Sequence, residues 1–369
     1  MIKILFFIET LEVGGAETVL QNLVNHMDQT KFNITVQTVW PSEASSLLAP
    51  GIRYKTTYQS KSSFNQLRYR LEAEAGLTYR LHIKDDYDIE CAFLEMGSTK
   101  IMAASTNKMA KKLAWVHCDL MKAFPNPDAF ATKAAPWYAK YDRIICVSQV
   151  VKDSFDKVFQ NRFDSTVLHN VIDDRSIREK ALLAPQHGKE KRRFTVLAVG
   201  RLTAPKNYLR LLRTHKRLLD DGLAHDLWIL GDGPDRGMLE AYIVEQHLQD
   251  SVWMPGFVEN PYPFMREADL LVCSSNYEGY STFVTEGIIL GRPIITTEVS
   301  GMRELLGDSE YGLIAENDDE AFYLGMKQMM TDRSRLARYA EKAAERGKTF
   351  SAAALTGDAE LLFEKMAGH

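Results

Sequence analysis

The feature that most constrains the fold of this chain is a repeated alternation of short apolar runs with stretches of helical spacing. The apolar runs lie at residues 3–8, 32–40, 88–94, 112–117, 143–147, 194–200, 226–231, 268–273 and 293–297. Runs that are largely apolar, rather than apolar at every second residue, are typical of strands buried on both faces. Helical spacing follows several of them, as in residues 16–26, and Ser148 is placed to cap the helix after the 143–147 run. This alternation predicts an α/β fold with parallel sheets covered by helices on both faces.

A polar stretch at residues 173–192, which contains proline and glycine, interrupts the alternation before it restarts near residue 194. Such a composition predicts a linker. Because 369 residues suit two domains of ordinary size, we predict two doubly wound, Rossmann-like halves at residues 1–175 and 190–350. A final helical stretch, residues 351–369, is predicted to pack back on the first half. Ligands of such sheets bind at the carboxyl ends of the strands, so the loops that follow strands are the informative ones.

Composition excludes several classes of protein. Hydrophobic residues make up 45% of the chain and charged residues 25%, as in ordinary globular proteins, which excludes a disordered chain. The 45 basic and 49 acidic residues give a net charge of −4, which excludes a dominant basic surface for nucleic acid. Residues 1–180 hold 23 basic and 21 acidic side chains, a net of +2, and the remainder hold 22 and 28, a net of −6. This weak asymmetry suggests that the two halves have different partners.

The cysteines and the apolar runs indicate the compartment. The four cysteines are too scattered for a zinc motif or a disulfide framework; they are Cys91, Cys118, Cys146 and Cys273. All but Cys118 lie within apolar runs, and we interpret these three as buried free thiols of a reducing compartment. The first apolar run ends at Glu9 and is too short for a signal peptide, and no window approaches 18 consecutive apolar residues. We therefore expect a cytoplasmic protein without a membrane-spanning segment.

Two loops that follow strands carry groups suited to phosphate. Gly14 and Gly15 come after the first strand, where glycines let backbone N–H groups approach a phosphate at a helix N-terminus. A plain turn explains a lone glycine pair equally well. Arg201 and Lys206 lie in GRLTAPKN (200–207), directly after the first strand of the second half. Arginine offers a forked donor and lysine a point charge, so the two together suit a diphosphate.

The stretch SSNYEGYSTFVTEGIILGRPIITT (274–297) carries the most specific pattern. A buried strand ends in a polar loop with Glu278, and a helix begins near Thr282, so the backbone amides of residues 280–282 would face an anion. Glu286 follows eight residues after Glu278, within the helix. Since carboxylates repel phosphate, their natural partners are hydroxyl groups. The combination suits a sugar nucleotide, whose diphosphate lies between sugar and ribose hydroxyls; a capped helix with a solvated glutamate is the plainer alternative.

Residues 274–306 resemble the signature of the retaining glycosyltransferases of family 4, the "group 1" glycosyl transferases. The resemblance extends, in order, through GGAE (14–17), LAWVH (113–117), GRLTAPKN (200–207), GDGP (231–234) and MPGFV (254–258). It covers essentially the whole chain, and the spacing of the two glutamates is its most specific element. The resemblance implies the GT-B fold, in which two Rossmann-like, doubly wound parallel-sheet domains face one another across a cleft.

The resemblance also implies roles for individual residues. Glu278 would hold hydroxyls of the transferred sugar, Glu286 the ribose, and His117, at a strand end, the sugar or the acceptor. The remaining donor-side residues would bind the diphosphate or the base; they are Gly14, Gly15, Arg201, Lys206, Val258, Tyr280, Ser281 and Thr282. This sequence has Tyr280-Ser281 where many relatives have Phe-Gly, and Gly287 where alanine is common. Neither difference removes a functional side chain, and the donor sugar stays open.

By this resemblance the chain is a retaining glycosyltransferase that moves a hexose-type sugar from a nucleotide-diphosphate donor, with UDP-sugar expected, to a hydroxyl of a glycan or a lipid-linked acceptor. GGAE and GMREL (301–305) resemble bacterial enzymes of capsule and exopolysaccharide biosynthesis, whose acceptors are commonly polyprenyl-diphosphate-linked sugars at the inner face of the cell membrane. One alternative is a sugar-nucleotide epimerase of the same fold, and another is a catalytically silent GT-B binding subunit. A dinucleotide-dependent oxidoreductase is disfavoured, because neither half has G-x-G-x-x-G after its first strand.

We expect no metal and no other cofactor. Asp86-Tyr87-Asp88 has the Asp-x-Asp form that other glycosyltransferase folds use for a divalent ion, but it precedes a strand, so we interpret it as turn and cap chemistry. The candidates for membrane contact are basic and apolar residues of one predicted helical segment and a lysine cluster; they are Lys61, Phe64, Leu67, Arg68, Arg70, Leu71, Arg80 and Lys84, and Lys108, Lys111 and Lys112. A helix that packs its apolar stripe on the sheet is the commoner explanation, and a helix resting on an anionic membrane is the alternative.

Overall fold

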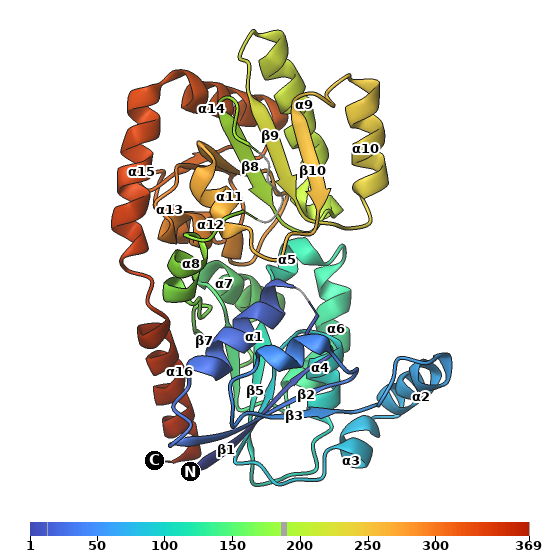
Figure 1. Ribbon diagram of the computed structural model, residues 1–369. Coiled ribbons are helices and arrows are strands. Elements are labelled where there is room, and N and C mark those ends of the chain that lie inside the picture. Colours follow the sequence, from blue (N-terminus) through green and yellow to red (C-terminus); the bar gives the residue numbers. More distant parts are fainter. Residues whose placement is uncertain (13, 186–189, 369) are drawn as a thin grey trace. The chain divides into compact units, whose positions relative to one another are not determined.

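The computed structural model describes residues 1–12, 14–185 and 190–368, and it divides the chain into two compact units (Figure 1). Unit 1 comprises Met1–Ile172 and Ala352–His369, and unit 2 comprises Asp173–Ser351. Both units alternate strands with helices, and every strand pair in each sheet is parallel. The predicted α/β class with two doubly wound, Rossmann-like parallel sheets is therefore confirmed.

Unit 1 contains a seven-stranded sheet with the strand order β3-β2-β1-β4-β5-β6-β7. Its strands are β1 (Ile2–Ile8), β2 (Phe32–Thr38), β3 (Arg53–Thr56), β4 (Ile89–Ala92), β5 (Lys111–Val116), β6 (Arg143–Cys146) and β7 (Ser165–Val167). The strand order reverses direction between β1 and β4, which are hydrogen-bonded neighbours. At such a switch point the two loops at the carboxyl ends diverge and leave room for a ligand.

The helices of unit 1 come from both ends of the chain. They are α1 (Gly15–His26), η1 (Glu43–Leu47), α2 (Ser63–Glu74), α3 (Thr78–His82), α4 (Gly97–Ala103), α5 (Leu120–Ala123), α6 (Pro127–Tyr138), α7 (Gln149–Val158) and α16 (Ala352–Ala367). The C-terminal helix α16 packs on α1 and β4. Its Phe363 is fully buried, with ring centroids 5.8 Å from Phe6 and 6.2 Å from Phe32. The last residues of the chain therefore complete the core of the unit that holds the first.

Unit 2 contains a six-stranded sheet with the order β10-β9-β8-β11-β12-β13. Its strands are β8 (Thr195–Val199), β9 (Asp226–Leu230), β10 (Val252–Gly256), β11 (Leu270–Cys273), β12 (Ile294–Thr297) and β13 (Leu313–Ala315), and its helices are α8 (Asp174–Lys180), η2 (Ala204–Lys206), α9 (Tyr208–Asp220), α10 (Arg236–Glu245), α11 (Tyr262–Glu267), α12 (Thr282–Ile289), α13 (Met302–Leu306), α14 (Asp319–Thr331) and α15 (Arg333–Gly347). The switch point lies between β8 and β11. The loops after these two strands carry Lys206 and Glu278.

All of the predicted strands are present, and the strands that were not predicted all lie at the edges of the sheets. Each of the nine predicted apolar runs contains a strand. The missed strands are the four edge strands of the two sheets, β3, β7, β10 and β13. An edge strand has a neighbour on one side alone, and the residues of β3 and β7 are at most partly buried. Such strands need no continuous apolar run, so the pattern that revealed the central strands could not reveal them.

One local prediction is wrong. The stretch 173–192 was predicted as a linker, but its first part forms helix α8, which packs on α11 and α12 within unit 2; residues 186–189 of this stretch lie outside the described residues. Asp173 caps this helix, accepting a hydrogen bond from the backbone N–H of Ser176 at 2.9 Å. The segment 63–82 is two helices, α2 and α3, because Gly76 between them has φ of +67° and breaks the helix.

Several smaller predictions are confirmed. The Ser148 side chain caps α7 by accepting a hydrogen bond from the backbone N–H of Val151 at 3.2 Å. All four cysteines are free thiols, and the three in apolar runs are buried. Among the described residues, none of the helices is both long enough and apolar enough to cross a bilayer.

Candidate active site

Three of the residues predicted for the donor lie at the switch point of the sheet in unit 2: Lys206, Glu278 and Ser281. A small pocket opens there between the ends of β8 and β11. Its lining residues are Ala198, Val199, Lys206, Tyr208, Val272, Cys273, Ser274, Ser275, Ser281 and Phe283. This is the place where the doubly wound topology predicts a ligand.

Lys206 lines this pocket and forms an ion pair with Glu278. The Lys206 Nζ atom donates a hydrogen bond to Glu278 Oε1 at 2.6 Å, and the Ser275 hydroxyl donates to the same oxygen at 2.7 Å. The two side chains are 29% and 10% exposed. Burial would lower the pKa of Lys206, but the attraction of Glu278 outweighs it and raises the pKa, so the ammonium keeps its charge. A fixed cation and a carboxylate therefore stand side by side.

The loops that carry this pair are bound to each other through their backbones. The Asn276 N–H donates to the carbonyl of Pro205 at 2.7 Å, and the Ser274 hydroxyl donates to the carbonyl of Lys206 at 2.9 Å. Asn207 has a left-handed backbone with φ of +46°, and its side chain both caps α9 and donates to Asn276 at 3.0 Å. These bonds fix the direction in which Lys206 leaves its loop, which is the preorganisation that a charge-stabilising site requires.

The N-terminus of α12 lies beside the same pocket. Ser281 is 3% exposed and caps the helix, accepting a hydrogen bond from the Val284 N–H at 3.5 Å. Tyr280 and Thr282 flank it, so the backbone amides predicted to face an anion lie together at the start of the helix. Gly301 supports this turn, because a Cβ atom there would lie 2.4 Å from the Gly279 carbonyl oxygen. The GMREL segment therefore holds the α12 turn by close backbone approach.

Glu286 lies farther along α12 and does not contact Lys206 or Glu278. Its Oε1 atom accepts a hydrogen bond from the Tyr262 hydroxyl at 3.2 Å. Burial raises the pKa of Glu286 to about 7, and the bond from Tyr262 opposes this rise. At the neighbouring Gly287 a Cβ atom would lie 2.6 Å from Leu271 Cδ1 and 2.9 Å from Ile294 Cδ1, so an alanine there would require these two side-chain ends to shift.

Arg201 and Val258 lie at the same edge of the sheet but outside the pocket. Arg201 follows β8 directly and is exposed, and in the described part of the chain no ion pair engages its guanidinium. Val258 follows the edge strand β10 and is 6% exposed. The GDGP motif (231–234) lies between these two residues in the sequence, and its first glycine is required sterically. A Cβ atom at Gly231, where φ is +146°, would lie 2.0 Å from the Gly200 carbonyl oxygen. Glycine here lets the ends of β8 and β9 approach.

In unit 1, Gly14 and Gly15 begin helix α1. Gly14 is the N-cap residue, with an extended backbone, and Gly15 is the first helical residue and is exposed. A Cβ atom at Gly15 would meet nothing within 4 Å, so packing within the protein does not explain the glycine. An exposed glycine at a helix N-terminus after β1 is the feature expected of a phosphate-binding turn; at Gly14, by contrast, the Glu17 carboxylate lies close to the backbone.

His117 follows β5, at the carboxyl edge of the sheet in unit 1. Its backbone N–H and that of Cys118 both donate to Glu95 Oε1, the second at 3.0 Å. Burial lowers the pKa of His117, although Glu95 and a hydrogen bond with the Phe93 backbone act in the opposite direction. The Nε2 atom is buried and has no hydrogen-bond partner among the described residues. A neutral imidazole with an unpaired nitrogen is ready to accept a hydrogen bond from a bound hydroxyl.

Some residues of these sites were missed. Ser275 binds Glu278, Tyr262 binds Glu286, and Glu95 holds the turn at His117. Ser275 and Glu95 each follow a strand by two or three residues, and this position could have identified them. Tyr262 carries no such signal, because it begins a helix in a different loop.

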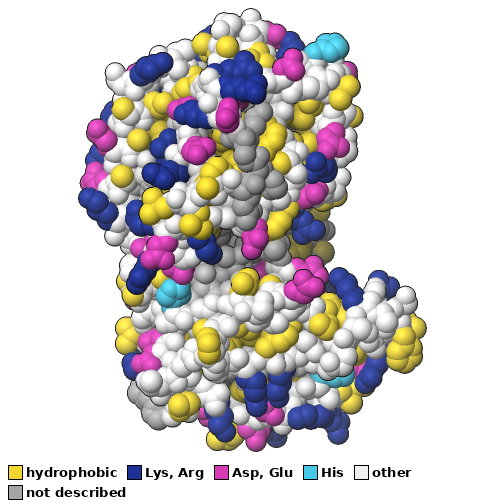
Figure 2. Space-filling model, in the orientation of Figure 1, with side chains coloured by type: hydrophobic (Ala, Val, Ile, Leu, Met, Phe, Trp, Pro, Cys, Tyr) yellow, Lys and Arg dark blue, Asp and Glu magenta, His cyan; other side chains and the backbone are white. Residues whose placement is uncertain are grey.

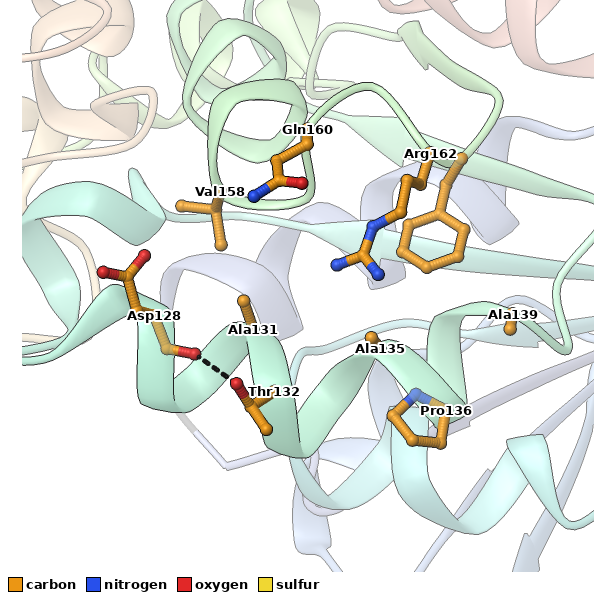
Figure 3. Close-up of a pocket in the computed structure, with 10 residues that line it drawn as sticks. Asp128, Ala131, Thr132, Ala135, Pro136, Ala139, Val158, Gln160 and Arg162 are labelled. Carbon is orange, nitrogen blue, oxygen red and sulfur yellow. Dashed lines mark hydrogen bonds between the residues drawn. The ribbon is translucent and has the colours of Figure 1, made fainter.

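A second, larger groove lies elsewhere, in unit 1. It has a volume of about 970 Å³ and runs along α6 in unit 1 (Figure 3). Alanines of α6 form its floor, and Gln160, Arg162 and Asp128 stand at its rim (Figure 3). None of the predicted site residues lines it. Its size reflects the surface between α6 and the end of α7 rather than the edge where strands end.

The second aspartate of the Asp-x-Asp sequence hydrogen-bonds to the backbone of unit 1. The Asp88 carboxylate accepts a hydrogen bond from the Lys3 N–H at 2.8 Å, next to the start of β4. Within residues 1–12, 14–185 and 190–368, no group of three or more metal-ligating side chains comes together. The interpretation as turn and cap chemistry agrees with this geometry.

Comparisons with known proteins agree with the geometry. Residues 179–346 match the family model described as glycosyl transferases group 1. A Campylobacter jejuni N-acetylgalactosamine-N,N'-diacetylbacillosaminyl-diphospho-undecaprenol 4-alpha-N-acetylgalactosaminyltransferase is 30% identical over 97% of this chain and 98% of its own length. The lipopolysaccharide core biosynthesis glycosyltransferase LpsE of Rhizobium meliloti is 29% identical over 41% of this chain and 43% of its own length.

Solved structures share the fold at lower sequence identity. The Anabaena protein HepE, determined in complex with UDP and glucose, is 17% identical and superposes with a TM-score of 0.76 over 98% of this chain and 99% of its own. TarM of S. aureus is 13% identical, with a TM-score of 0.77 over 98% and 100%. Two doubly wound, Rossmann-like units of this kind form the GT-B fold. The chain belongs to the group 1 glycosyl transferases.

Proposed function

We propose that this glycosyltransferase retains configuration and moves a hexose-type sugar from a UDP-sugar to a hydroxyl of a lipid-linked glycan acceptor, in the synthesis of a surface polysaccharide such as a capsule or exopolysaccharide. The observation that carries the proposal is the contact of Lys206 with Glu278 at the switch point of unit 2. A cation suited to a diphosphate lies against a carboxylate suited to sugar hydroxyls. Two relatives support the choice of substrates, since the Campylobacter protein's name contains an undecaprenol-linked acceptor and HepE was determined with UDP and glucose.

On the donor side, the bond between the anomeric carbon and the diphosphate oxygen breaks heterolytically. Negative charge grows on the leaving diphosphate while the sugar gains oxocarbenium character. Lys206, Arg201 and the amides at the start of α12 stabilise the leaving group, and each such preorganised donor is worth about 2.7–4 kcal/mol in comparable sites. Glu278 accepts hydrogen bonds from the sugar hydroxyls, and Glu286 from the ribose. Protein cations, rather than a metal ion, neutralise the diphosphate in this proposal.

On the acceptor side, the new glycosidic bond forms on the face that the diphosphate leaves, so configuration is retained. The acceptor hydroxyl loses its proton to an oxygen of the departing phosphate. His117 does not act as a nucleophile: its unpaired Nε2 atom accepts a hydrogen bond from a hydroxyl of the sugar or the acceptor. The low pKa that burial gives this imidazole keeps it neutral, which is the form that can accept.

The test is a transfer assay with purified protein, a panel of UDP-sugars and a polyprenyl-diphosphate-linked sugar as acceptor. We expect one donor to yield an elongated acceptor whose new anomeric centre has the donor's configuration by NMR, with turnover unchanged by EDTA. Inverted configuration would contradict the retaining mechanism. Conversion of a UDP-sugar without acceptor would favour the epimerase, and failure to bind any UDP-sugar would favour the silent subunit.

We also propose that helix α2 brings unit 1 to an anionic membrane surface. The helix projects from the rest of unit 1 (Figure 1), and none of its residues is buried. Phe64, Leu67 and Leu71 lie on one helical face and are 73%, 58% and 63% exposed. The prediction that this apolar stripe packs on the sheet is therefore wrong.

Basic residues surround this apolar face. Lys61, Arg70, Arg80 and Lys84 are exposed, whereas the acidic residues of α2 are paired: Glu72 with Arg68 at 2.6 Å and Glu74 with Lys100 at 3.0 Å. Figure 2 shows hydrophobic and basic side chains gathered on the projecting segment. On its inner side α2 is anchored by Tyr69, whose ring centroid lies 5.6 Å from that of Trp40. Exposed apolar residues ringed by positive charge fit an anionic lipid surface.

Vesicle flotation tests this surface. At low salt we expect the protein to float with vesicles of phosphatidylglycerol and phosphatidylcholine. With vesicles of phosphatidylcholine alone it should remain in the bottom fraction. Replacing Phe64, Leu67 and Leu71 by serine should weaken binding about 100-fold, if each partly buried side chain contributes about 1 kcal/mol. The matched control replaces Met238 and Val244 of α10 in unit 2 by serine. These two side chains are 50% and 58% exposed. Equal binding by the α2 variant and the control would refute the assignment to α2.

A further inference from the structure

The environment of Glu286 contains a residue that the proposed function does not use. The Tyr262 hydroxyl donates to Oε1 of Glu286, and in the described part of the chain no other protein group hydrogen-bonds this carboxylate. The second carboxylate oxygen is not among the buried unpaired atoms. One oxygen is therefore held by the protein while the other stays open to a ligand.

Tyr262 is itself held in place from two sides. It is the first residue of α11, between Pro261 and Pro263, whose rings fix the backbone there. Its N–H donates to the Asn260 side-chain oxygen at 3.3 Å, and the Asn260 amide donates to the carbonyl of Lys180, at the end of α8, at 3.1 Å. The tyrosine ring thus reaches Glu286 from a short helix that is fixed to α8 and packed against it.

We propose that Tyr262 is a positioning residue for ribose recognition: its hydroxyl fixes the Glu286 carboxylate so that the free oxygen accepts a hydrogen bond from the ribose of the nucleotide. This inference rests on the proposed function, in which Glu286 binds the ribose. A glutamate side chain has three rotatable bonds, so a bond that selects one orientation removes an ordering cost that the nucleotide would otherwise meet on binding.

The same hydrogen bond acts on the acidity of Glu286. Burial raises the pKa of this carboxyl to about 7, and the Tyr262 hydroxyl lowers it. The pKa of Tyr262 itself is raised by burial, by Glu286 and by Asp173, the N-cap of α8. Without the hydroxyl, Glu286 titrates at a higher pH, so a larger fraction is protonated near neutrality and accepts hydrogen bonds poorly.

The test compares UDP with 2′,3′-dideoxy-UDP, which lacks the ribose hydroxyls but keeps the base and the diphosphate. Calorimetry gives the ratio of the two Kd values for wild type, Tyr262→Phe, Glu286→Ala and the control Tyr242→Phe on α10. We expect wild type and control to prefer UDP and Glu286→Ala to lose the preference. Tyr262→Phe should lower it about 3–10-fold at pH 6.5, as for one hydrogen bond, and less at pH 8.5, where a larger fraction of the carboxyl is ionised.

The outcomes separate this inference from the proposed function. If Glu286→Ala keeps the wild-type preference for UDP, the assignment of Glu286 to the ribose fails. If Glu286→Ala loses the preference while Tyr262→Phe keeps it at both pH values, the donor site stands and the role of Tyr262 is refuted. If Tyr262→Phe weakens both nucleotides equally, the tyrosine supports the fold alone, which also refutes the inference.

Discussion

Replacing Lys206 by alanine is expected to lower kcat for glycosyl transfer by about 10²–10³-fold. The Lys206 ammonium is fixed by Glu278 and by the loop around it, so it stabilises the departing diphosphate without reorganising. Its contribution arises mainly in the transition state, where the charge on the leaving group is largest. We therefore expect kcat to fall more than KM for the donor rises.

The same substitution leaves the Glu278 carboxylate 10% exposed and without its cation, held by the Ser275 hydroxyl and by a longer contact with the Cys273 thiol at 3.8 Å. Such a loss costs about 1–3 kcal/mol of stability, which must be separated from the loss of catalysis. The double variant Lys206→Met with Glu278→Gln removes both charges and should recover most of the thermal stability. It should not recover activity, because the diphosphate still lacks its cation.

A matched control exists at the opposite edge of the same sheet. Lys191 precedes β8 and pairs with Asp269, which precedes β11, at 2.7 Å. This pair links the same two strands at their amino ends. Lys191→Ala should change kcat less than twofold. If both lysine variants lose equal activity, or if Lys206→Ala keeps wild-type kcat, the assignment of Lys206 to the diphosphate is wrong.

The contrast between these pairs shows how much of the site the sequence could predict. Lys206 and Glu278 were identified because each follows a central strand, and the topology brings the carboxyl ends of neighbouring strands together. Their mutual contact was not predicted: Lys206 was assigned to phosphate and Glu278 to hydroxyls, whereas the structure joins them. A strand pattern gives the edge at which a residue lies, and side-chain geometry decides which groups touch.

The parts of the fold that escaped prediction are those that do not need apolar residues. Edge strands such as β3 and β7 have a neighbouring strand on one side only, and their residues are at most partly buried. Helix α2 exposes its apolar stripe to solvent instead of packing it on the sheet. Tyr262 escaped for a different reason, because its partner lies 24 residues away on another helix. Helix α8 escaped because its residues are mostly charged, and Ile177 is its one buried residue.

A pair of buried histidines in unit 2 gives the second large effect, on stability. His215 of α9 and His225, just before β9, are both fully buried, and His215 Nδ1 lies 2.7 Å from His225 Nε2. His215 Nε2 lies 2.9 Å from the Ser251 hydroxyl, and His225 Nδ1 lies 2.7 Å from the Leu223 carbonyl. This chain of hydrogen bonds is satisfied when both rings are neutral. It lies where strands begin, away from the carboxyl edge.

The pKa values of both histidines are lowered, mainly by burial. The pKa of His215 falls to about 2, with His225 and Arg193 adding to the effect of burial. For His225 the Leu223 hydrogen bond and Asp226 oppose the fall, and Arg193 adds to it. In the unfolded chain both rings take up protons near pH 6.5. The unfolded state therefore binds more protons below that pH, so the stability of unit 2 is complete above pH 6.5 and falls as the pH decreases.

We expect His215 to lower the free energy of unfolding by about 1.4 kcal/mol per pH unit below pH 6.5, and His225, whose pKa is lowered less, to contribute a smaller slope. Between pH 7.5 and 5.5 His215 then costs about 1.4 kcal/mol, or about 3–6 °C in Tm for a unit of this size, and His225 adds to this loss. Thermal unfolding measures this, with His215→Gln, which removes one titrating ring, and His247→Asn as an exposed control. The His215 variant should start less stable at pH 7.5, because a buried hydrogen bond is lost, but lose less than half as much on acidification, because only the weaker contribution of His225 remains. The control should follow wild type. An equal loss in the His215 variant and wild type would show that the acid sensitivity comes from other groups.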